Sequence, residues 1–300
     1  MQRIVKNKKM NWDTYTSYIK KLSTRYPHAE VSTCGKSHLK RELFSLSLGK
    51  GTNYVLYVGG VHAQEWITSV LLLRFYEDLC DRYACGGELA GLNVREILSD
   101  RRLIIIPELN PDGIEIALTG AQAAGEYKAI CEKVSKGDYS CWNANARGVD
   151  INHNFDAGWE VLHQMERREG ITAPSARRYG GTHAESEDET KALTRLCREL
   201  PIRHAIALHS QGEEVYWEYG KSMPPKAFLM AKIFAAITEY TLVKNEGLAS
   251  HGGFKDWFIS EFSRPAFTVE VGKGQNPLPI SQLEEIYLKI EEMLCIGIIM

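Results

Sequence analysis

The sequence predicts an α/β fold: a single-domain, mixed and largely parallel sheet with helices on both faces. Short apolar segments such as "NYVLYVGG" (53–60), "RRLIIIPEL" (101–109) and "HAIALHS" (204–210) have the length and composition of buried strands. Longer segments with apolar residues at helical spacing separate them. Strands that are apolar on both faces are typical of sheets covered on both sides.

The elements of the N-terminal half can be taken in order. Residues 12–27 ("WDTYTSYIKKLSTRYP") have helical spacing and end at proline, which predicts a first helix. Residues 42–49 ("ELFSLSLG") alternate between apolar and polar, as a half-buried strand does. Residues 65–83 are predicted as a long helix with a core-facing side, and the strand 101–109 is expected to close at the turn "NPDG" (110–113).

The C-terminal half continues the same pattern. Residues 225–240 and 281–294 are predicted as amphipathic helices, and residues 265–272 ("PAFTVEVG") as another buried strand. The sequence contains no internal repeat, no low-complexity tract and no Pro/Ser-rich linker. Residues 1–300 are therefore expected to form one domain.

Composition excludes several classes of function. The 300 residues carry a net charge of −2, which gives no electrostatic reason to expect a nucleic-acid partner. No apolar stretch is long enough to span a membrane, and the N-terminus lacks the apolar region of a signal peptide. The seven cysteines show no CxxC pair and are expected to be reduced thiols. We expect a cytoplasmic enzyme without a membrane partner, and the sequence does not predict its oligomeric state.

Residues of catalytic type occur where the expected strands end, which is where ligands bind in open α/β sheets. His62 and Glu65 follow one strand in "GGVHAQEW", and His209 ends another. Two histidines and one glutamate form a known catalytic zinc set, with the fourth position left for water. Taken alone, an HxxE pair is more often just two exposed polar residues, but its position after a buried strand favours the metal site.

Glu270 interrupts the otherwise apolar strand "AFTVEVG" near its end. An apolar wall would raise the pKa of this carboxylate towards neutrality and allow it to take a proton from metal-bound water. The alternative is an edge strand whose glutamate faces solvent, and this stretch alone favours neither reading.

Several spaced motifs together resemble the M14-type zinc carboxypeptidase family. In the order of the family they are "GGVHAQEW", "NPDGIE", "ARGVDINHNFDAGW", "YGGTHAESEDETKAL", "LHSQGEEVYW", "GGFKDW" and "FTVEVGKG". The resemblance extends from about the third strand to near the C-terminus. It is closest to the bacterial branch that cleaves γ-D-glutamyl-diamino-acid bonds in cell-wall peptides.

The resemblance implies one zinc ion (Zn2+) per chain, held by His62, Glu65 and His209. It also implies that Glu270 is the general base that deprotonates the zinc-bound water and later protonates the departing amine. Asp150 in "GVD" matches a carboxylate that orients the first histidine ligand, a role that fixes the imidazole tautomer. From the residues alone, Asp150 could also be a capping or turn aspartate.

The chain departs from the family pattern at positions that contact substrate. In place of "DxNRN" it has "DINHN": Asn152 is retained, but His153 replaces the arginine that forks onto the substrate's terminal carboxylate. Asn143 stands where the family has an arginine that polarises the scissile carbonyl, and Leu248 where it has a tyrosine in the covering loop. Arg147 either reaches the site or forms a salt bridge outside it.

Lys255 in "GGFKDW" matches the base of the pocket for the residue after the cleaved bond. A lysine there favours a carboxylate-bearing group, such as the side chain of meso-diaminopimelate. The alternative is a lysine in solvent at the start of a helix.

The resemblance thus implies hydrolysis of a γ-D-glutamyl-diaminopimelate type of bond in a murein-derived peptide substrate. Three alternatives remain open at this point: a carboxypeptidase of ordinary peptides, a deacylase of small acyl amino acids, and a non-catalytic zinc- or peptide-binding protein. Retention of Glu270, which a protein that only binds would not need, argues against the last.

Overall fold

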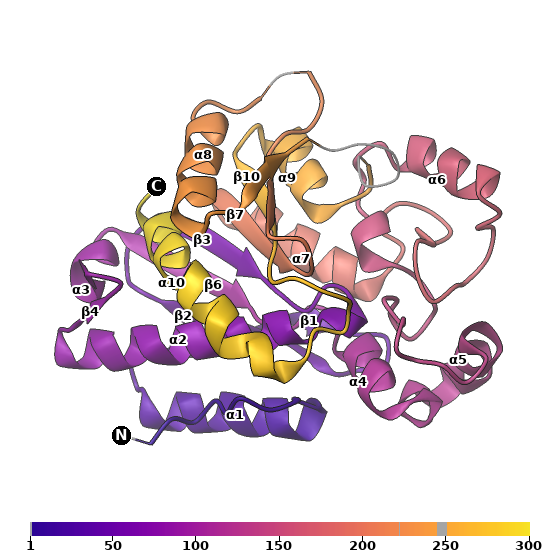
Figure 1. Ribbon diagram of the computed structural model, residues 1–300, viewed down its shortest axis with the longest axis horizontal. Helices are drawn as coiled ribbons and strands as arrows, with labels where there is room; N and C mark the ends of the chain where they lie inside the picture. Colours follow the sequence, from indigo (N-terminus) through magenta and orange to yellow (C-terminus); the bar gives the residue numbers. More distant parts are fainter. Residues whose placement is uncertain (1, 222, 245–250) are drawn as a thin grey trace.

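The computed structural model describes residues 2–221, 223–244 and 251–300. Its central feature is an eight-stranded sheet in the order β1-β2-β6-β3-β7-β10-β8-β9 (Figure 1). In chain order the strands are β1 Glu30–Lys36, β2 Glu42–Leu48, β3 Asn53–Val58, β6 Arg101–Ile106, β7 Ile202–His209, β8 Glu214–Tyr216, β9 Thr241–Val243 and β10 Ala266–Glu270.

The four central strands β6, β3, β7 and β10 run parallel. Strands β1 and β2 add an antiparallel edge, and β8 pairs antiparallel with β10 but parallel with β9. The mixed, largely parallel sheet expected from the sequence is therefore confirmed. Parallel strands bring their carboxyl ends to one edge, and this arrangement positions the site.

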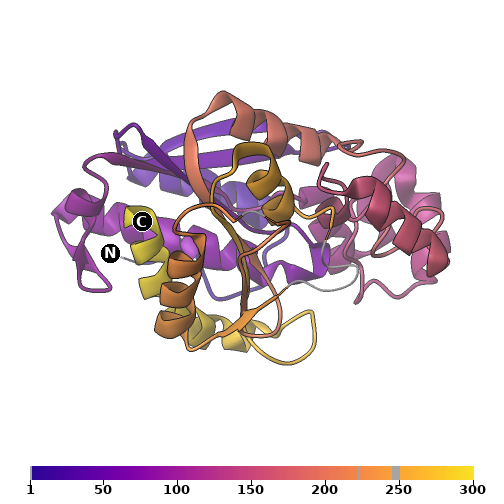
Figure 2. The same ribbon diagram turned by 90° about the horizontal axis from the view of Figure 1, so that it is seen from above.

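Helices cover both faces of the sheet (Figures 1 and 2). Along β3, Val55 and Tyr57 belong to one apolar core, whereas Leu56 and Val58 belong to the other. The first core includes residues of α1 Trp12–Arg25, α2 Ile67–Cys85, α8 Ala227–Thr238 and α10 Leu283–Ile299. The second includes residues of α7 Asp188–Glu199 and α9 Phe254–Phe262. None of the helices in the described ranges has the length and hydropathy needed to cross a membrane.

The long segment between β6 and α7 gathers at one side of the molecule, on the right in Figure 1. It packs against the loop after β3, where the backbone N–H of Ala63 donates to the carbonyl of Asn143 at 3.1 Å. Its helices are α4 Pro111–Thr119, α5 Lys128–Ser135 and α6 Trp159–Arg168, with 3-10 turns η2 Ala121–Tyr127 and η3 Ile151–His153. Between α2 and β6 lie the hairpin β4 Glu88–Leu89 and β5 Leu92–Asn93 and the short helix α3 Val94–Ile97.

The stretch "NPDG" is the main local difference from the expectation. Instead of an isolated turn, it begins helix α4, with Asn110 as N-cap and Pro111 in the first turn. Oδ1 of Asn110 accepts the N–H of Gly113 at 2.9 Å. The Nδ2 group of Asn110 donates to the carbonyls of Val61 and Ala144 at 3.1 and 3.2 Å. This one side chain therefore ties the start of α4 to two loops of the site.

Two glycines at the end of β3, Gly59 and Gly60, let the chain turn towards the site. Their carbonyls still accept backbone hydrogen bonds from the segment that follows β6. The N–H of Leu109 donates to the carbonyl of Gly59 at 3.1 Å, and the N–H of Asn110 to that of Gly60 at 2.9 Å. Gly60 has a φ of +58°. A Cβ at this position would lie 2.5 Å from Oγ of Ser69 and 3.0 Å from Cα of Glu108. Glycine is therefore required here both by conformation and by close packing.

We expect Gly60→Ala to destabilise the protein by about 2–5 kcal/mol, because the left-handed conformation costs roughly 1–2 kcal/mol and overpacking roughly 1–3 kcal/mol. Gly91→Ala is the matched control: its φ is +74°, and a Cβ there would meet nothing within 4 Å. That variant should lose only the conformational part. Urea unfolding of both proteins measures the difference, and equal losses would show that close packing at Gly60 is unimportant.

Glu108 is a buried carboxylate on the loop just before Asn110, with 1% of its surface exposed. Among the described residues, no hydrogen-bond partner reaches its Oε2. Burial, reinforced by the charge of Glu115 and opposed by Arg41, raises the pKa of Glu108 to about 8. The folded protein therefore holds this proton at pH values where the unfolded chain has released it.

This pKa predicts a pH-dependent effect of Glu108→Gln. A raised carboxyl pKa costs stability as the pH rises from about 4.5 to about 8, since only unfolding releases the proton there. The variant should match the wild type near pH 4 and be more stable by about 2–5 kcal/mol above pH 8. Urea unfolding at both pH values, with the exposed Glu126→Gln as control, measures this. A difference that does not depend on pH would contradict it.

Candidate active site and metal centre

Three adjacent parallel strands supply the central residues of the site. The chain leaves β3 through Gly59 and Gly60, so that His62 and the 3-10 turn η1 Ala63–Glu65 lie beyond the strand's carboxyl end. His209 is the last residue of β7. Glu270, the last residue of β10, is in direct register with His209. The register of the sheet therefore places residues that are far apart in the sequence at one point.

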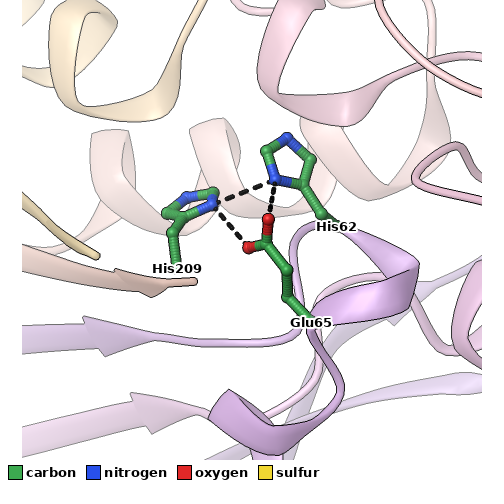
Figure 3. A group of neighbouring side chains, drawn as sticks. All are labelled: His62, Glu65 and His209. Carbon is green, nitrogen blue, oxygen red and sulfur yellow. Dashed lines mark hydrogen bonds and ion pairs between the residues drawn. The ribbon is translucent and has the colours of Figure 1, made fainter. Parts of the chain in front are cut away.

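The side chains of His62, Glu65 and His209 point towards one another (Figure 3). Nδ1 of His62 lies 2.9 Å from Oε1 of Glu65, and Nδ1 of His209 lies 3.1 Å from Oε2 of the same carboxylate. The two imidazole nitrogens are 3.2 Å apart. The backbone N–H of Ser210 donates to Oε2 of Glu65 at 3.1 Å and holds the carboxylate in place.

This donor set fits a transition-metal cation. Two imidazole nitrogens and one carboxylate face a common point, and each can offer a lone pair to a cation placed between them. The combination of two histidines and a glutamate is a known catalytic zinc set that leaves a coordination position for water. The ligand atoms lie within 4.8 Å of one another, so small side-chain movements bring all three onto one ion.

The pKa values of His62 and Glu65 depend on the charges of their neighbours. Burial would lower the pKa of His62, but the charges of Glu65 and Asp150 raise it well above the usual value. Burial likewise acts to raise the pKa of Glu65, but His62 and His209 hold it at about 2. The buried carboxylate of Glu65 is thus stable as an anion only because the positive charge of the imidazoles lies beside it.

Asp150 lies on the far side of His62 from Glu65. Its Oδ1 is 3.2 Å from Nε2 of His62 and accepts the N–H of Asn152, also at 3.2 Å. Its Oδ2 accepts the N–H of Arg178 at 2.9 Å. Although burial opposes it, the charges of His62 and His153 hold the pKa of Asp150 well below its usual range. A carboxylate in this place fixes the imidazole with Nδ1 directed at the other ligands.

Glu270 faces the same pocket from the interior of the sheet. Strand β10 lies between β7 and β8, so the alternative of an edge strand is wrong. Burial, together with the charges of Glu65 and Glu214 and opposed by His62, raises the pKa of Glu270 well above the usual range. A carboxylate with a raised pKa is suited to accept and return a proton near neutral pH.

An open pocket extends from His62 and brings together most of the residues expected from the sequence. Its walls include His62, Asn143, Asp150, Asn152, His153, Lys255 and Glu270. Glu65 and His209 lie behind this wall, buried. Leu248 lies outside the described residues.

The polar residues of the pocket wall are held by specific hydrogen bonds. Oδ1 of Asn152 accepts the N–H of Phe254 at 3.0 Å. Nδ1 of His153 lies 2.9 Å from Oε1 of the buried Glu166 and 3.0 Å from the carbonyl of Arg178. Since both neighbours accept hydrogen bonds, this nitrogen carries the proton and does not face the substrate.

Lys255 lies in the pocket wall rather than in solvent, with 4% of its side chain exposed. Its ammonium group donates to the carbonyl of Glu218 at 2.7 Å and forms an ion pair with Asp256. Among the described residues, these partners take two of its three N–H groups. The lysine thus meets the pocket with its charge already paired.

Arg147 does not line the pocket. Its guanidinium lies 3.4 Å from Oε1 of Glu187 and 3.5 Å from Nε2 of His38. The local reason is Asn145, whose Oδ1 accepts the N–H groups of Arg147 and Val149 and turns the arginine away from the site. Of the two readings that the sequence left open, the structure shows the ion pair outside the site.

The cluster around Arg147 contains a second set of metal-ligand types, namely His38, Glu187 and Glu189. Here the carboxylate oxygens already have donors. Nδ2 of Asn145 donates to Glu187 at 2.7 Å, and Ser186 donates to Glu187 at 2.7 Å. A guanidinium and an amide therefore take the place that a cation would need.

The pocket also contains residues that the sequence analysis missed. These are Arg177, Arg178, Tyr216, His251, Asp256 and Thr268. Four of them lie in or beside recognised motifs: Tyr216 in "GEEVYW", His251 and Asp256 in "HGGFKDW", and Thr268 in the strand that ends at Glu270. The pair Arg177–Arg178 directly precedes "YGG". Two adjacent arginines beside a family motif could have indicated from the sequence that this pair lines the pocket.

Comparisons with known proteins were made against this geometry. The family model for zinc carboxypeptidases, Peptidase_M14, matches residues 15–292. The chain is 33% identical over 271 residues to gamma-D-glutamyl-L-diamino acid endopeptidase 1 of Lysinibacillus sphaericus, covering 90% of this chain and 67% of that protein. It is 34% identical over 274 residues to uncharacterized protein YqgT of Bacillus subtilis, covering 90% of this chain and 72% of that protein.

A solved structure shows the likeness of fold. The thrombin-activatable fibrinolysis inhibitor superposes with a TM-score of 0.78 over 99% of this chain and 76% of that chain, at 21% identity. At this identity the similarity supports the fold alone.

We expect the chain to bind about one zinc ion and His209→Ala to lose it, because the remaining two ligands cannot hold a catalytic zinc. His38→Ala is the matched control, since its cluster already contains donors in place of an ion. Zinc should raise the Tm of the wild type and of His38→Ala, but not that of His209→Ala, because binding to the folded state stabilises it. Zinc analysis after dialysis and thermal unfolding measure this. Full zinc content in His209→Ala, or its loss in His38→Ala, would contradict the assignment.

Proposed function

The chain belongs to the zinc carboxypeptidase family Peptidase_M14, and from this premise we propose that it hydrolyses γ-D-glutamyl-diamino-acid bonds in murein-derived peptides. The observation that carries the proposal is the register of β7 and β10, which places a glutamate beside a two-histidine, one-glutamate cluster. The choice of substrate is supported by the relative from Lysinibacillus sphaericus, whose name states cleavage of this kind of bond.

His62, Glu65 and His209 would hold one zinc ion. When bound, zinc would supply a Lewis acid that makes a water molecule acidic enough to react at neutral pH, and its charge would offset that of Glu65. Asp150 keeps the His62 ring oriented through its contact with Nε2. Ser210 keeps the Glu65 carboxylate in place through its backbone N–H.

Glu270 moves the proton. Its carboxylate takes a proton from the attacking water as the water oxygen bonds to the carbonyl carbon of the scissile amide. The same group then donates this proton to the amide nitrogen as the C–N bond breaks, so that an acid and an amine are released. The partly buried position of Glu270 near the carboxylates of Glu65 and Glu214 supports this role, because it raises the pKa of Glu270 well above the usual range.

Asn143 is the candidate donor to the carbonyl oxygen of the scissile bond. Its side chain is buried in the pocket wall, and its backbone carbonyl is anchored by Ala63. Arg147, the other candidate from the sequence, pairs with Glu187 instead. Preorganised donors at such a position stabilise the charge that develops on the oxygen.

The pocket supports action within a peptide rather than only at its C-terminus. His153 directs Nδ1 to Glu166 and lacks the two-pronged donor geometry of an arginine, so the usual hold on a terminal carboxylate is missing. Lys255 retains one N–H beyond its described partners and supports a carboxylate-bearing diamino acid, such as meso-diaminopimelate, after the cleaved bond.

The test is hydrolysis of L-alanyl-γ-D-glutamyl-meso-diaminopimelate by the zinc-loaded protein. Glu270→Gln should lower kcat by about a hundredfold or more while zinc content stays unchanged, because glutamine cannot accept the proton. Glu126→Gln, which removes an exposed carboxylate outside the pocket, serves as the control. Loss of zinc in Glu270→Gln would make Glu270 a ligand instead of a base. Absence of cleavage by the wild type would refute the proposed function.

A further inference from the structure

Two adjacent arginines, Arg177 and Arg178, line the active-site pocket. We propose that they form a binding site for a carboxylate of the peptide substrate and so help to determine specificity, an inference that rests on the proposed function. The proposed hydrolysis assigns no role to the side chains of these two arginines. Arginine offers a planar fork of N–H donors that matches the two oxygens of a carboxylate.

The backbone of Arg178 is fixed by residues of the site itself. Its N–H donates to Oδ2 of Asp150 at 2.9 Å, and its carbonyl lies 3.0 Å from Nδ1 of His153. The next residue, Tyr179, accepts the N–H of Asp150 at 2.8 Å. Arg178 also has a φ of +68°, an unfavourable conformation for a residue with a side chain, which persists only where surrounding contacts impose it. The contacts here come from the same aspartate that orients His62.

These arginines are more accessible to an anion than Lys255, whose one remaining N–H can donate only a single hydrogen bond to a carboxylate. Lys255 is buried and already paired with Asp256. Arg178, in contrast, has an exposed partner, Glu169, at 3.2 Å, and both side chains are half exposed. Arg177 is exposed and forms no ion pair with the described part of the chain. Surface pairs of this kind contribute little, so an incoming carboxylate can replace Glu169 at small cost.

The proposed substrate carries carboxylates on both sides of the cleaved bond. A glutamate joined through its γ-carboxyl keeps a free α-carboxylate, and this lies on the residue before the bond. A diamino acid such as meso-diaminopimelate brings carboxylates on the residue after it. His153, which lies next to Arg178, is the position at which the chain lacks an arginine, so Arg177 and Arg178 are the arginines that line this pocket.

The experiment compares three peptides with wild-type protein and with Arg177→Ala/Arg178→Ala, all zinc-loaded. One peptide is L-alanyl-γ-D-glutamyl-meso-diaminopimelate. The second has the α-carboxyl of the glutamate amidated, and the third has the carboxyls of the diamino acid amidated. The double variant should lower kcat/KM for the first peptide about ten- to a hundredfold, as expected for lost charge-assisted hydrogen bonds. Arg167→Ala, which removes an exposed arginine outside the pocket, should leave it unchanged.

The amidated peptides identify the carboxylate and test the inference. The peptide that has lost the bound carboxylate should be cut poorly by the wild type and show little further loss in the double variant, because the two changes remove the same contact. If the second peptide behaves in this way, the arginines bind the glutamyl carboxylate; if the third does, they bind the diamino acid. An equal loss for all three peptides, or no loss, would overturn the inference.

Binding measurements keep this result separate from the proposed function. Calorimetric titration of the same peptides onto zinc-loaded Glu270→Gln and onto the same variant lacking both arginines gives the Kd ratio without cleavage. A ten- to hundredfold weaker Kd for the two peptides that retain the bound carboxylate, with little change for the one that lacks it, supports the arginine site even if the wild type cuts none of the three peptides. Unchanged Kd values would overturn the arginine site even if the wild type cuts all of them.

Discussion

The buried carboxylate of Glu65, between His62 and His209, is the contact on which the arrangement of the site depends. Moving an ionised carboxylate out of water costs several kcal/mol unless positive charge and hydrogen bonds replace the solvent. Here the two imidazoles and the N–H of Ser210 provide that environment, and Asp150 on the other side of His62 favours positive charge on that imidazole. The parallel strands β3, β7 and β10 make this possible, because their carboxyl ends deliver each group to the same edge of the sheet.

Residues whose place follows from the preceding strand could be located from the sequence. His62, His209 and Glu270 each end or directly follow an apolar run, and such runs are long enough to identify as buried strands. Their meeting at one point then follows from parallel pairing. The helices at 12–27, 225–240 and 281–294 were equally clear, because their apolar spacing is helical throughout and the structure has α1, α8 and α10 in these ranges.

Features that depend on contacts distant in the sequence could not be predicted in this way. Arg147 is close in sequence to Asn143, but the side chain of Asn145 turns it towards Glu187. Arg178 reaches the pocket through a hydrogen bond to Asp150, 28 residues earlier. Local signals were ambiguous for "NPDG", since an asparagine cap and a proline suit both a turn and the first turn of a helix.

Asp150 connects the proposed metal site with the proposed arginine site. One oxygen faces the imidazole of His62, and the other accepts the backbone N–H of Arg178. If a bound peptide changed the contact with Arg178, it would alter the carboxylate that faces His62, and binding of peptide and binding of metal would be coupled. Thermodynamic reciprocity then applies: whatever factor a bound peptide adds to the affinity for zinc, zinc adds to the affinity for that peptide. With such coupling, the zinc concentration needed to fill the site would vary with the concentration of peptide.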